Sequence, residues 1–490
     1  MFSLHESDEK QIGLDEIISQ CRCRSPQGNR LKNAKHFFAP AEKSELAEEL
    51  DAVAAIADLI LAKPDEAAEA QRILSQLREL RGTLHGLEQE RLLDETEFFE
   101  LKRAIAIFNR LALHPNLMNA AKVSMCALGD AERLLDPAGS GAQGFYIYSE
   151  YSQKLRKLRE QKRELEHQIS EASNELRLQL LKERNLLGAI EDEEEERVRR
   201  ELGIQLLHFL PELQANSENC ALLDFRIAKA ELALKWQACK PSLAEAEEDA
   251  LIKEAWHPLV QASLKKLGAS FSPHSIRLER GATVISGANM GGKSIALQTV
   301  FLSLTLAQMG YFPPSKELRT PLYAFMTFSA EMAGDYDLGL SSFGKEAVKI
   351  REDFRRSKQK RGLIVMDEPC RGTNPSEATA IVQALCNAYA GMSSTLLIAS
   401  HYKVNPGLGI RFYRIKGIKP ENLQLIRADA GTADSHLIKQ IQAMMDYHLE
   451  EVDGDHPVPS AAIKIAELLG IDPELIAAMK ALWQEEKWQK

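Results

Sequence analysis

A glycine-rich stretch at residues 286–297 reads SGANMGGKSIAL and has the residue types of a phosphate-binding loop. Residues 287–294 fit Gly-x-x-x-x-Gly-Lys-Ser, between the apolar run ATVIS (282–286) and a helix-like run. The glycines allow several backbone N–H groups to converge on phosphate oxygens, and a helix N-terminus adds positive potential. We therefore predict that Lys293 reaches the β- and γ-phosphates and that Ser294 ligates Mg²⁺. The candidate ATP-binding residues of the loop are Gly287, Ala288, Asn289, Met290, Gly291, Gly292, Lys293, Ser294 and Ile295.

Two carboxylates end a second apolar run, LIVMD (363–367). The carboxyl ends of parallel strands meet at one edge of a sheet, so we expect Asp367 and Glu368 beside the phosphate loop. There Asp367 would hold Mg²⁺ through water. Glu368 would orient and deprotonate the water that attacks the γ-phosphate.

A third apolar run, TLLIA (395–399), leads to His401. Its strand would end at the same edge, so we predict that His401 senses the γ-phosphate, like the switch histidine of an ABC-type ATPase. The alternative is an ordinary surface histidine. The predicted catalytic residues are Glu368, His401 and Lys293.

The composition is that of a globular chain of two to four domains, with 490 residues, 44% hydrophobic and 27% charged. The sequence has no apolar run of 18 residues and no apolar core near its polar N-terminus, so we expect neither a membrane span nor a signal peptide. Seven scattered cysteines without a CxxC pair favour a reducing, cytoplasmic setting without structural zinc. The net charge of −10 provides no support for duplex binding.

The chain changes character near residue 250. Before it, helix-forming residues dominate, and 45–62 is an amphipathic helix; after residue 280 the three apolar runs indicate buried parallel strands. Residues 410–428 look like two further strands around a proline-containing turn. We expect an all-helical N-terminal core with a long antiparallel helical arm, followed by a P-loop, ABC-type α/β ATPase domain.

The arm is predicted from residues 151–187, which contain neither glycine nor proline, and from the helix-like return at 197–213. Between them, EDEEEE (191–196) follows Gly188, so we expect an acidic tip. Charge patterning alone favours a solvated helical hairpin. The functional interpretation is a lever that contacts a partner.

These motifs together resemble the MutS family, the ABC-class ATPases of DNA mismatch repair. GANMGGKS is close to the family's phosphate loop, MDEPCRGT to its Asp-Glu-x-x-Arg-Gly-Thr stretch, and ASHY to its histidine switch. WHPLV (256–260) resembles the segment that opens the family's ATPase domain. Weaker similarity links CRCRSPQGNRL (21–31) and LLDFRIAKAELAL (222–234) to the start and the closing helix of its helical core. PSAAIKIAELLGIDPELI (459–476) resembles the element that pairs two subunits.

The resemblance implies further site residues. Phe271 would stack on adenine, and Asn289 would touch the phosphates. The segment SSFGKE (341–346) would meet the γ-phosphate bound to the other subunit of a homodimer. The candidate trans-signature residues are Ser341, Ser342, Phe343 and Gly344. The chain departs from the family pattern where Gly-Lys follows Phe343 and Ala347 follows Glu346.

The resemblance also implies a domain plan. Residues 1–150 and 214–250 would form the helical core, 151–213 the lever-like arm, 251–445 the ATPase domain, and 446–490 a C-terminal helical dimerisation element. Fewer than about twenty residues precede CRCRSPQG, so we expect a shortened protein without the mismatch-recognition and connector domains. The short arm leaves no room for a clamp domain.

Two functions stay open at this point, with Mg²⁺ and ATP as cofactors of both. The first is an ATPase that acts on DNA in a mismatch-repair-like or recombination-related role. The second is a protein-remodelling ATPase, such as a reactivase for a cobalamin-dependent amino-acid aminomutase, without DNA binding. The expected partners are a second copy of the chain, DNA, an aminomutase-type client or a MutL-like protein, and no membrane. A degenerate ATPase that acts as a scaffold is disfavoured by the intact motifs.

Overall fold

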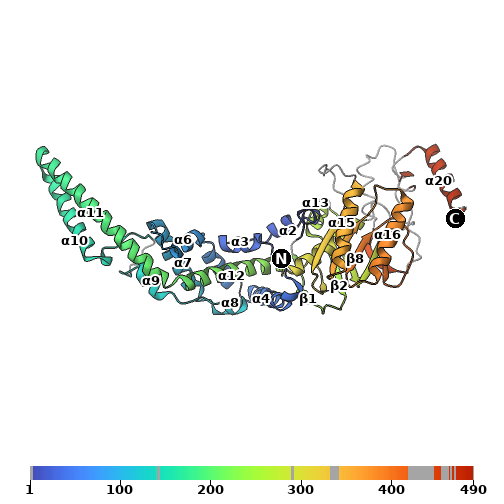
Figure 1. Ribbon diagram of the computed structural model, residues 1–490, viewed down its shortest axis with the longest axis horizontal. Coiled ribbons are helices and arrows are strands. Elements are labelled where there is room, and N and C mark those ends of the chain that lie inside the picture. The colour runs from blue at the N-terminus through green and yellow to red at the C-terminus, as the bar shows by residue number, and fades with distance from the viewer. Residues whose placement is uncertain are drawn as a thin grey trace. The chain divides into compact units, whose positions relative to one another are not determined.

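The computed structural model describes residues 4–139, 141, 144–287, 292–330, 342–417, 446–453, 463, 466–467 and 471–488. The chain divides into two compact units (Figure 1). The sheet unit comprises Met1–Cys21, His36–Asp51 and Leu232–Lys490. The helical unit comprises Arg22–Lys35 and Ala52–Glu231. Among the described residues, no helix combines the length and the apolar character that crossing a membrane requires.

A six-stranded sheet with the order β10-β9-β4-β8-β7-β6 forms the centre of the sheet unit. All neighbouring strands are parallel except the edge pair β9 and β10. The three predicted strands are confirmed as β4, β7 and β8, because buried parallel strands are continuous apolar runs. The strand bounds are β4 Gly281–Ser286, β6 Phe325–Ser329, β7 Gly362–Asp367, β8 Thr395–Ala399, β9 Ile410–Gly417 and β10 Asp446–Val452.

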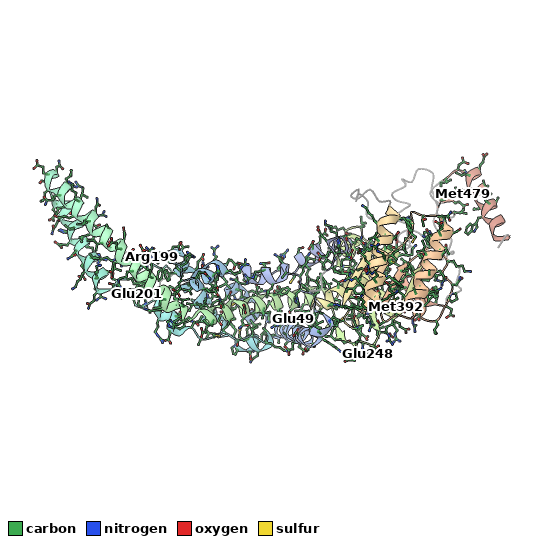
Figure 2. All side chains as sticks on the ribbon, in the orientation of Figure 1. Glu49, Arg199, Glu201, Glu248, Met392 and Met479 are labelled. Carbon is green, nitrogen blue, oxygen red and sulfur yellow. The ribbon has the colours of Figure 1, made fainter. Side chains whose placement is uncertain are left out.

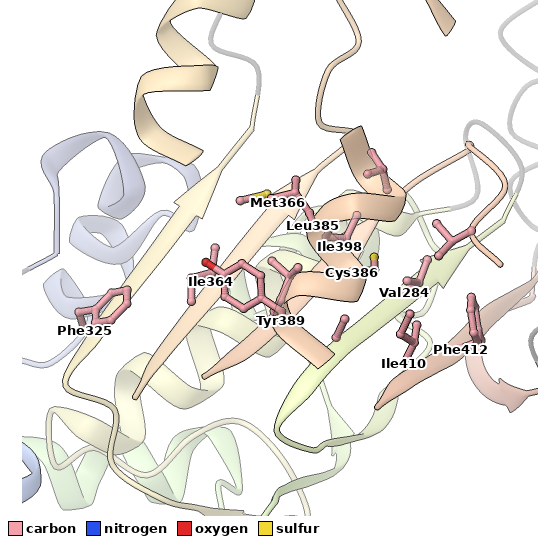
Figure 3. Packing of buried hydrophobic residues seen from close by; sticks show 14 residues of the cluster. Val284, Phe325, Ile364, Met366, Leu385, Cys386, Tyr389, Ile398, Ile410 and Phe412 are labelled. Atoms are coloured by element: carbon pink, nitrogen blue, oxygen red, sulfur yellow. The ribbon is translucent and has the colours of Figure 1, made fainter. Parts of the chain in front are cut away.

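Three helices connect these strands: α14 (Lys293–Gln308), α15 (Ser342–Ser357) and α16 (Pro375–Ala390). Helix α16 packs its buried face, including Tyr389 and Cys386, against Ile364, Ile398 and other strand residues (Figure 3). Helix α14 is buried along nearly its whole length, which fits a helix that is apolar on every side. It contacts strands of the six-stranded sheet and of a second, smaller sheet.

The smaller sheet has the order β1-β5-β2-β3. Its strands are β1 Ser242–Leu243, β2 Ala250–Ala255, β3 His274–Leu278 and β5 Glu317–Thr320. The sheet unit also holds the helices α1 Glu6–Gln11, α2 Leu14–Ser19, α13 Pro258–Lys266 and α20 Pro473–Trp488 and the short 3-10 helix Pro40–Glu42.

The described part of the helical unit contains no strand. Its helices are α3 Pro26–Asn33, α5 Pro64–Leu74, α6 Arg81–Glu88, α7 Glu95–Leu111, α8 Pro115–Ala120, α9 Gly129–Leu135, the 3-10 helix Ser149–Tyr151, α10 Gln153–Glu171 and α11 Asn174–Leu207. The chain passes between the units at four points, two of which fall within α4 (Lys43–Ala62) and α12 (Leu210–Trp236).

One buried carboxylate ties the start of the helical unit to its last helix. Asp224 of α12 is 1% exposed and accepts hydrogen bonds from the backbone N–H groups of Arg24 and Ser25 and from the Ser25 hydroxyl. A Cβ on Gly28 would lie 2.3 Å from Asp224 Oδ2, so the chain has no room for a side chain there. The structure thus brings together residues from the segments 21–31 and 222–234. The family resemblance implied that these segments open and close the helical core.

The arm is antiparallel, but the prediction of an acidic tip is wrong. Helix α10 ends at Glu171, Ala172 and Ser173 are extended, and α11 runs without a break through the EDEEEE run. Within that run, Glu191 pairs with Arg159 at 2.9 Å and with Lys162 at 2.5 Å. Figure 2 labels Arg199 and Glu201, which follow the acidic run on α11.

Ser173 is the N-cap residue of α11 but makes no side-chain capping hydrogen bond, and Gly188, which suggested a break in the sequence, is an isolated glycine of the kind that a helix tolerates. The acidic run is instead paired with the basic first turns of α10. A second pair, Arg184 with Glu166 at 3.1 Å, fits the same antiparallel register.

The units also differ from the predicted domain boundaries. Met1–Cys21 and His36–Asp51 belong to the sheet unit, although we expected 1–150 to lie in the helical core. Residues 446–452 form the edge strand β10 rather than part of a helical element. The second strand expected within 410–428 begins beyond Gly417 and lies outside the described residues.

Candidate nucleotide site

The phosphate-loop context is present: β4 leads to Gly287, and Gly292 precedes α14. Gly292 has φ +83°, and a Cβ there would lie 2.8 Å from Cδ1 of Tyr447. A side chain at this position is therefore disfavoured both by backbone strain and by contact with Tyr447 of β10. Four predicted loop residues lie outside the described part of the chain: Ala288, Asn289, Met290 and Gly291.

Lys293 begins α14 and is only 5% exposed. Its ammonium donates a hydrogen bond to the carbonyl of Gly287, the residue that follows β4, at 2.9 Å. The ammonium also lies 3.4 Å from Glu368 Oε1. The sequence motifs of the loop and of the second strand thus meet in one ion pair. Ile295, in the first turn of α14, is half-buried.

The two predicted carboxylates follow directly on β7. Asp367 is the last residue of the strand and is in register with Ala399 of β8. The Glu368 amide donates to the Ala399 carbonyl at 2.9 Å, while its own φ is +49°. This backbone turns the Glu368 side chain towards Lys293 instead of letting the strand continue.

The surroundings of Asp367 fit a magnesium ion. Asp367 Oδ1 is buried and has no hydrogen-bond partner among the described residues, while Ser294 hydrogen-bonds the same carboxyl group. Burial and the neighbouring Glu368 raise the pKa of Asp367 above its usual value, against the opposing effects of Ser294 and Lys293. A cation would compensate for the burial of this carboxylate. The described residues hold no group of three or more His, Cys, Asp or Glu side chains that could hold a metal ion by themselves, and Mg²⁺ commonly takes only one or two carboxylates with water and phosphate oxygens.

The turn at residues 368–373 contains a contact that sequence reasoning missed. Cys370 is fully buried with φ +65°, and its amide donates to both carboxylate oxygens of Glu346 at 3.0 Å. Burial and the Glu346 charge raise the pKa of the Cys370 thiol to about 11. Arg371 Nε lies 3.5 Å from Glu368 Oε2. No local pattern signals the Glu346 contact, because it joins α15 to a turn that follows the next strand.

His401 lies beyond the carboxyl end of β8 and is exposed. Its ring centroid is 4.1 Å from that of Tyr402. Among the described residues, His401 has no hydrogen bond or ion pair with Lys293, Asp367 or Glu368. Burial raises the pKa of the neighbouring Tyr402, and the nearby Glu368 carboxylate acts in the same direction.

Phe271, the predicted adenine contact, is half-buried and lies 5.4 Å from the ring of His274, in an edge-on arrangement. Burial, with a smaller effect of His448, lowers the pKa of His274 to about 4, so this ring is neutral at pH 7. His448 follows Tyr447, the residue that packs on Gly292. Strand β10 is therefore a neighbour both of β3, which begins at His274, and of Gly292.

The predicted trans-signature lies at the start of α15. The helix begins at Ser342, and Phe343 and Gly344 are half-buried. Ser341 lies outside the described residues. A single chain cannot bring this segment to a site on a second copy, so its role stays a prediction.

Comparison with known proteins finds similarity over the part of the chain that holds these residues. Residues 283–480 match the model of MutS domain V. The chain is 31% identical over 235 residues to Endonuclease MutS2 of Ligilactobacillus salivarius (strain UCC118), which covers 48% of this chain and 28% of that protein. It is 27% identical over 295 residues to DNA mismatch repair protein MutS of Aquifex pyrophilus, which covers 59% of this chain and 32% of that one. The matches thus span about a third of the length of these relatives.

Proposed function

We propose that this chain, whose residues 283–480 match the model of MutS domain V, is a MutS-family ATPase that binds Mg·ATP at the edge formed by β4, β7 and β8 and hydrolyses it to drive movement of its helical arm. The observation that carries this proposal is the meeting of Lys293, Glu368, Asp367 and Ser294 at one place. These four residues supply a phosphate-binding cation, a general base and two oxygen ligands for a metal.

Each residue has a separate task in this mechanism. Lys293 binds the β- and γ-phosphates, and in doing so exchanges its contact with Glu368 for a contact with phosphate. Glu368 then accepts the proton of the attacking water, which it also orients. Ser294 and Asp367 would hold Mg²⁺, which neutralises charge on the phosphate oxygens. His401, beyond β8, is the proposed sensor of the γ-phosphate.

We further propose a homodimer with composite sites, in which the start of α15 meets the nucleotide bound to the partner. The exposed apolar side chains of α20 support subunit pairing: Leu482 is 65% exposed and Trp483 42%. A mixture of Ser341→Ala and Lys293→Ala chains tests this. Partial recovery of ATPase activity is expected, because one composite site then joins an intact loop to an intact signature. No recovery would contradict the shared site.

For the client, the names of the relatives favour DNA. The acidic run on α11 is consistent with this role, because it is neutralised within the arm instead of forming an acidic tip. We therefore propose a mismatch-repair-like or recombination-related function as the first candidate. The net charge of −10 requires that binding use a local basic surface.

A protein client is the second candidate, and one feature of the arm favours it. In the half of α11 that follows the turn, leucine side chains are exposed to solvent: Leu176 at 51%, Leu178 at 62% and Leu186 at 66%. Exposed apolar side chains suit a protein surface better than a phosphate backbone. The client would be remodelled by the arm, as in the reactivation of an aminomutase-type enzyme.

A salt titration of DNA binding decides between these candidates. A DNA enzyme binds duplex or branched DNA tighter than about micromolar at low salt, with an affinity that falls steeply as salt rises. Weaker binding at low salt would contradict the DNA role. Replacing Leu176 and Leu178 with serine should leave DNA binding unchanged but weaken the ATP-dependent capture of a protein client.

A further inference from the structure

The backbone of the 368–373 turn is strained, and this strained backbone sets the direction of the Glu368 side chain. Both Glu368 and Cys370 have positive φ angles, +49° and +65°, although neither is glycine. Each such residue costs about 1 kcal/mol or more, so the surrounding structure must hold the turn in place. Within the turn itself, the described backbone hydrogen bond is that of the Thr373 amide to the Cys370 carbonyl, at 3.2 Å.

Glu346, which lies on α15, holds this turn through a hydrogen bond that it accepts from the Cys370 amide. Its two carboxylate oxygens each lie 3.0 Å from the Cys370 amide nitrogen. A carboxylate that accepts from a backbone N–H makes a stronger hydrogen bond than a neutral acceptor. Because Cys370 is fully buried, water cannot replace this acceptor without opening the turn.

Helix α15 gives Glu346 a fixed support. Lys349 lies three residues after Glu346, and Asp353 lies four residues after Lys349, so the three side chains share one face of the helix. Lys349 donates to Asp8 of α1 at 2.9 Å and to the Phe328 carbonyl of β6 at 2.5 Å. Asp353 accepts from Thr327 of β6 at 3.0 Å. One face of α15 is thus bound to β6 and α1 and, through Glu346, to the turn that carries Glu368.

We propose that Glu346 is a positioning residue, which holds the Cys370 amide and thereby sets the position of the Glu368 carboxylate for attack by water. This inference rests on the proposed ATPase function. Since α15 starts at the segment proposed to meet the partner's nucleotide, movement of its first turn reaches Glu368 of the same chain through a single contact. Contact of α15 with the nucleotide bound to the partner would then change the position of Glu368 in this chain's own site.

Three variants of the full chain test this role. Glu346→Ala removes the acceptor, Glu346→Gln keeps an uncharged acceptor for the same amide, and Glu352→Ala removes an exposed carboxylate from the same helix as a matched control. We expect Glu346→Ala to lower kcat about 10- to 100-fold while the Kd for ATP changes less than about threefold. Glu346→Gln should recover part of kcat, and Glu352→Ala should behave as the wild type.

A second readout needs no hydrolysis. The buried Cys370 thiol should react slowly with N-ethylmaleimide in the wild type and in Glu352→Ala, and clearly faster in Glu346→Ala, as measured by mass spectrometry of its peptide. Unchanged labelling together with an unchanged kcat would overturn the inference. A parallel loss of ATP binding and kcat would also overturn it, because it indicates general unfolding. A wild type without ATPase activity would instead overturn the proposed function, and with it the catalytic purpose of Glu346.

Discussion

Lys293 Nζ and Glu368 Oε1 lie 3.4 Å apart, with side chains only 5% and 15% exposed. The lysine comes from the first turn of α14 and the glutamate from the residue after β7, so two separate motifs meet in one shielded ion pair. Removing one partner of such a shielded ion pair is destabilising, because the remaining charge then has neither a partner nor access to water. A phosphate, however, offers Lys293 a replacement anion.

Replacing Lys293 with alanine should therefore abolish measurable ATP binding. The change removes the cation that would bind phosphate and leaves Glu368 to repel the incoming charge, at a cost on the order of 2–5 kcal/mol. Titration with a fluorescent ATP analogue measures the affinity. Lys403→Ala, which removes an exposed lysine beyond β8, is the control and should bind normally. Unchanged affinity in Lys293→Ala would refute the phosphate-loop assignment.

Gly292→Ala should weaken ATP binding by about tenfold, because the left-handed backbone costs about 1–2 kcal/mol with a side chain present. The new Cβ would also lie 2.8 Å from Tyr447. Adding Tyr447→Ala should relieve the contact but not the backbone strain, so recovery should be partial. Gly188→Ala in α11 is the control: a Cβ there meets no atom within 4 Å, and about 0.5–1 kcal/mol of stabilisation is expected. Equal ATP affinity in all four proteins would contradict the role of Gly292.

The helical unit should depend strongly on Asp224. Replacement by alanine leaves the amides of Arg24 and Ser25 and the Ser25 hydroxyl without their acceptor, which should cost about 3 kcal/mol. Urea unfolding followed by circular dichroism measures this loss. Asp58→Ala, at an exposed position of α4, should change the stability by less than about 0.5 kcal/mol. Similar unfolding midpoints for both variants would show that Asp224 does not hold the segments together.

Asp353 should make the sheet unit less stable as pH rises. Burial raises its pKa from 3.8 to about 6, despite the opposing effects of Thr327, Lys349 and Arg356. The unfolded chain therefore loses this proton first, so the free energy of unfolding falls between about pH 4 and pH 6 and stays lower above.

Asp353→Asn keeps an acceptor for Thr327 but removes the titration. At pH 7.5 the variant should be more stable than the wild type by on the order of 1–3 kcal/mol, with the difference shrinking towards pH 4. Thermal melts across this pH range measure it, with Glu352→Gln as the exposed control. A difference that does not vary with pH would contradict a raised pKa at Asp353.

The parts of the fold that could be predicted are those in which local pattern and burial agree. The runs 282–286, 363–367 and 395–399 appear as strands because a buried parallel strand is apolar on both faces. Strand β10 reads DYHLEEV, which is too polar to indicate a strand, and it forms only by pairing with β9. Its polarity fits its place at the edge of the sheet, where none of the described strands lies on its far side.

The position of the arm's turn could not be read from composition, because Ala172 and Ser173 carry no strong turn signal. The register is set instead by ion pairs such as Arg159 with Glu191, which join residues far apart in the chain. The same limit applied at the candidate site. The motif residues could be recognised in the sequence from their types and spacing. Glu346 and Tyr447 could not, because their contacts with Cys370 and Gly292 exist only in the folded chain.

The most direct test of the account is single-turnover ATP hydrolysis by Glu368→Gln beside the wild type, with ATP binding measured on the same samples. The glutamine is nearly isosteric but cannot accept the proton, and it frees Lys293 from a competing anion. We predict ATP binding at least as tight as in the wild type and a hydrolysis rate lower by about 100-fold or more. Hydrolysis at the wild-type rate would contradict the claim that Glu368, held beside Lys293, is the catalytic base.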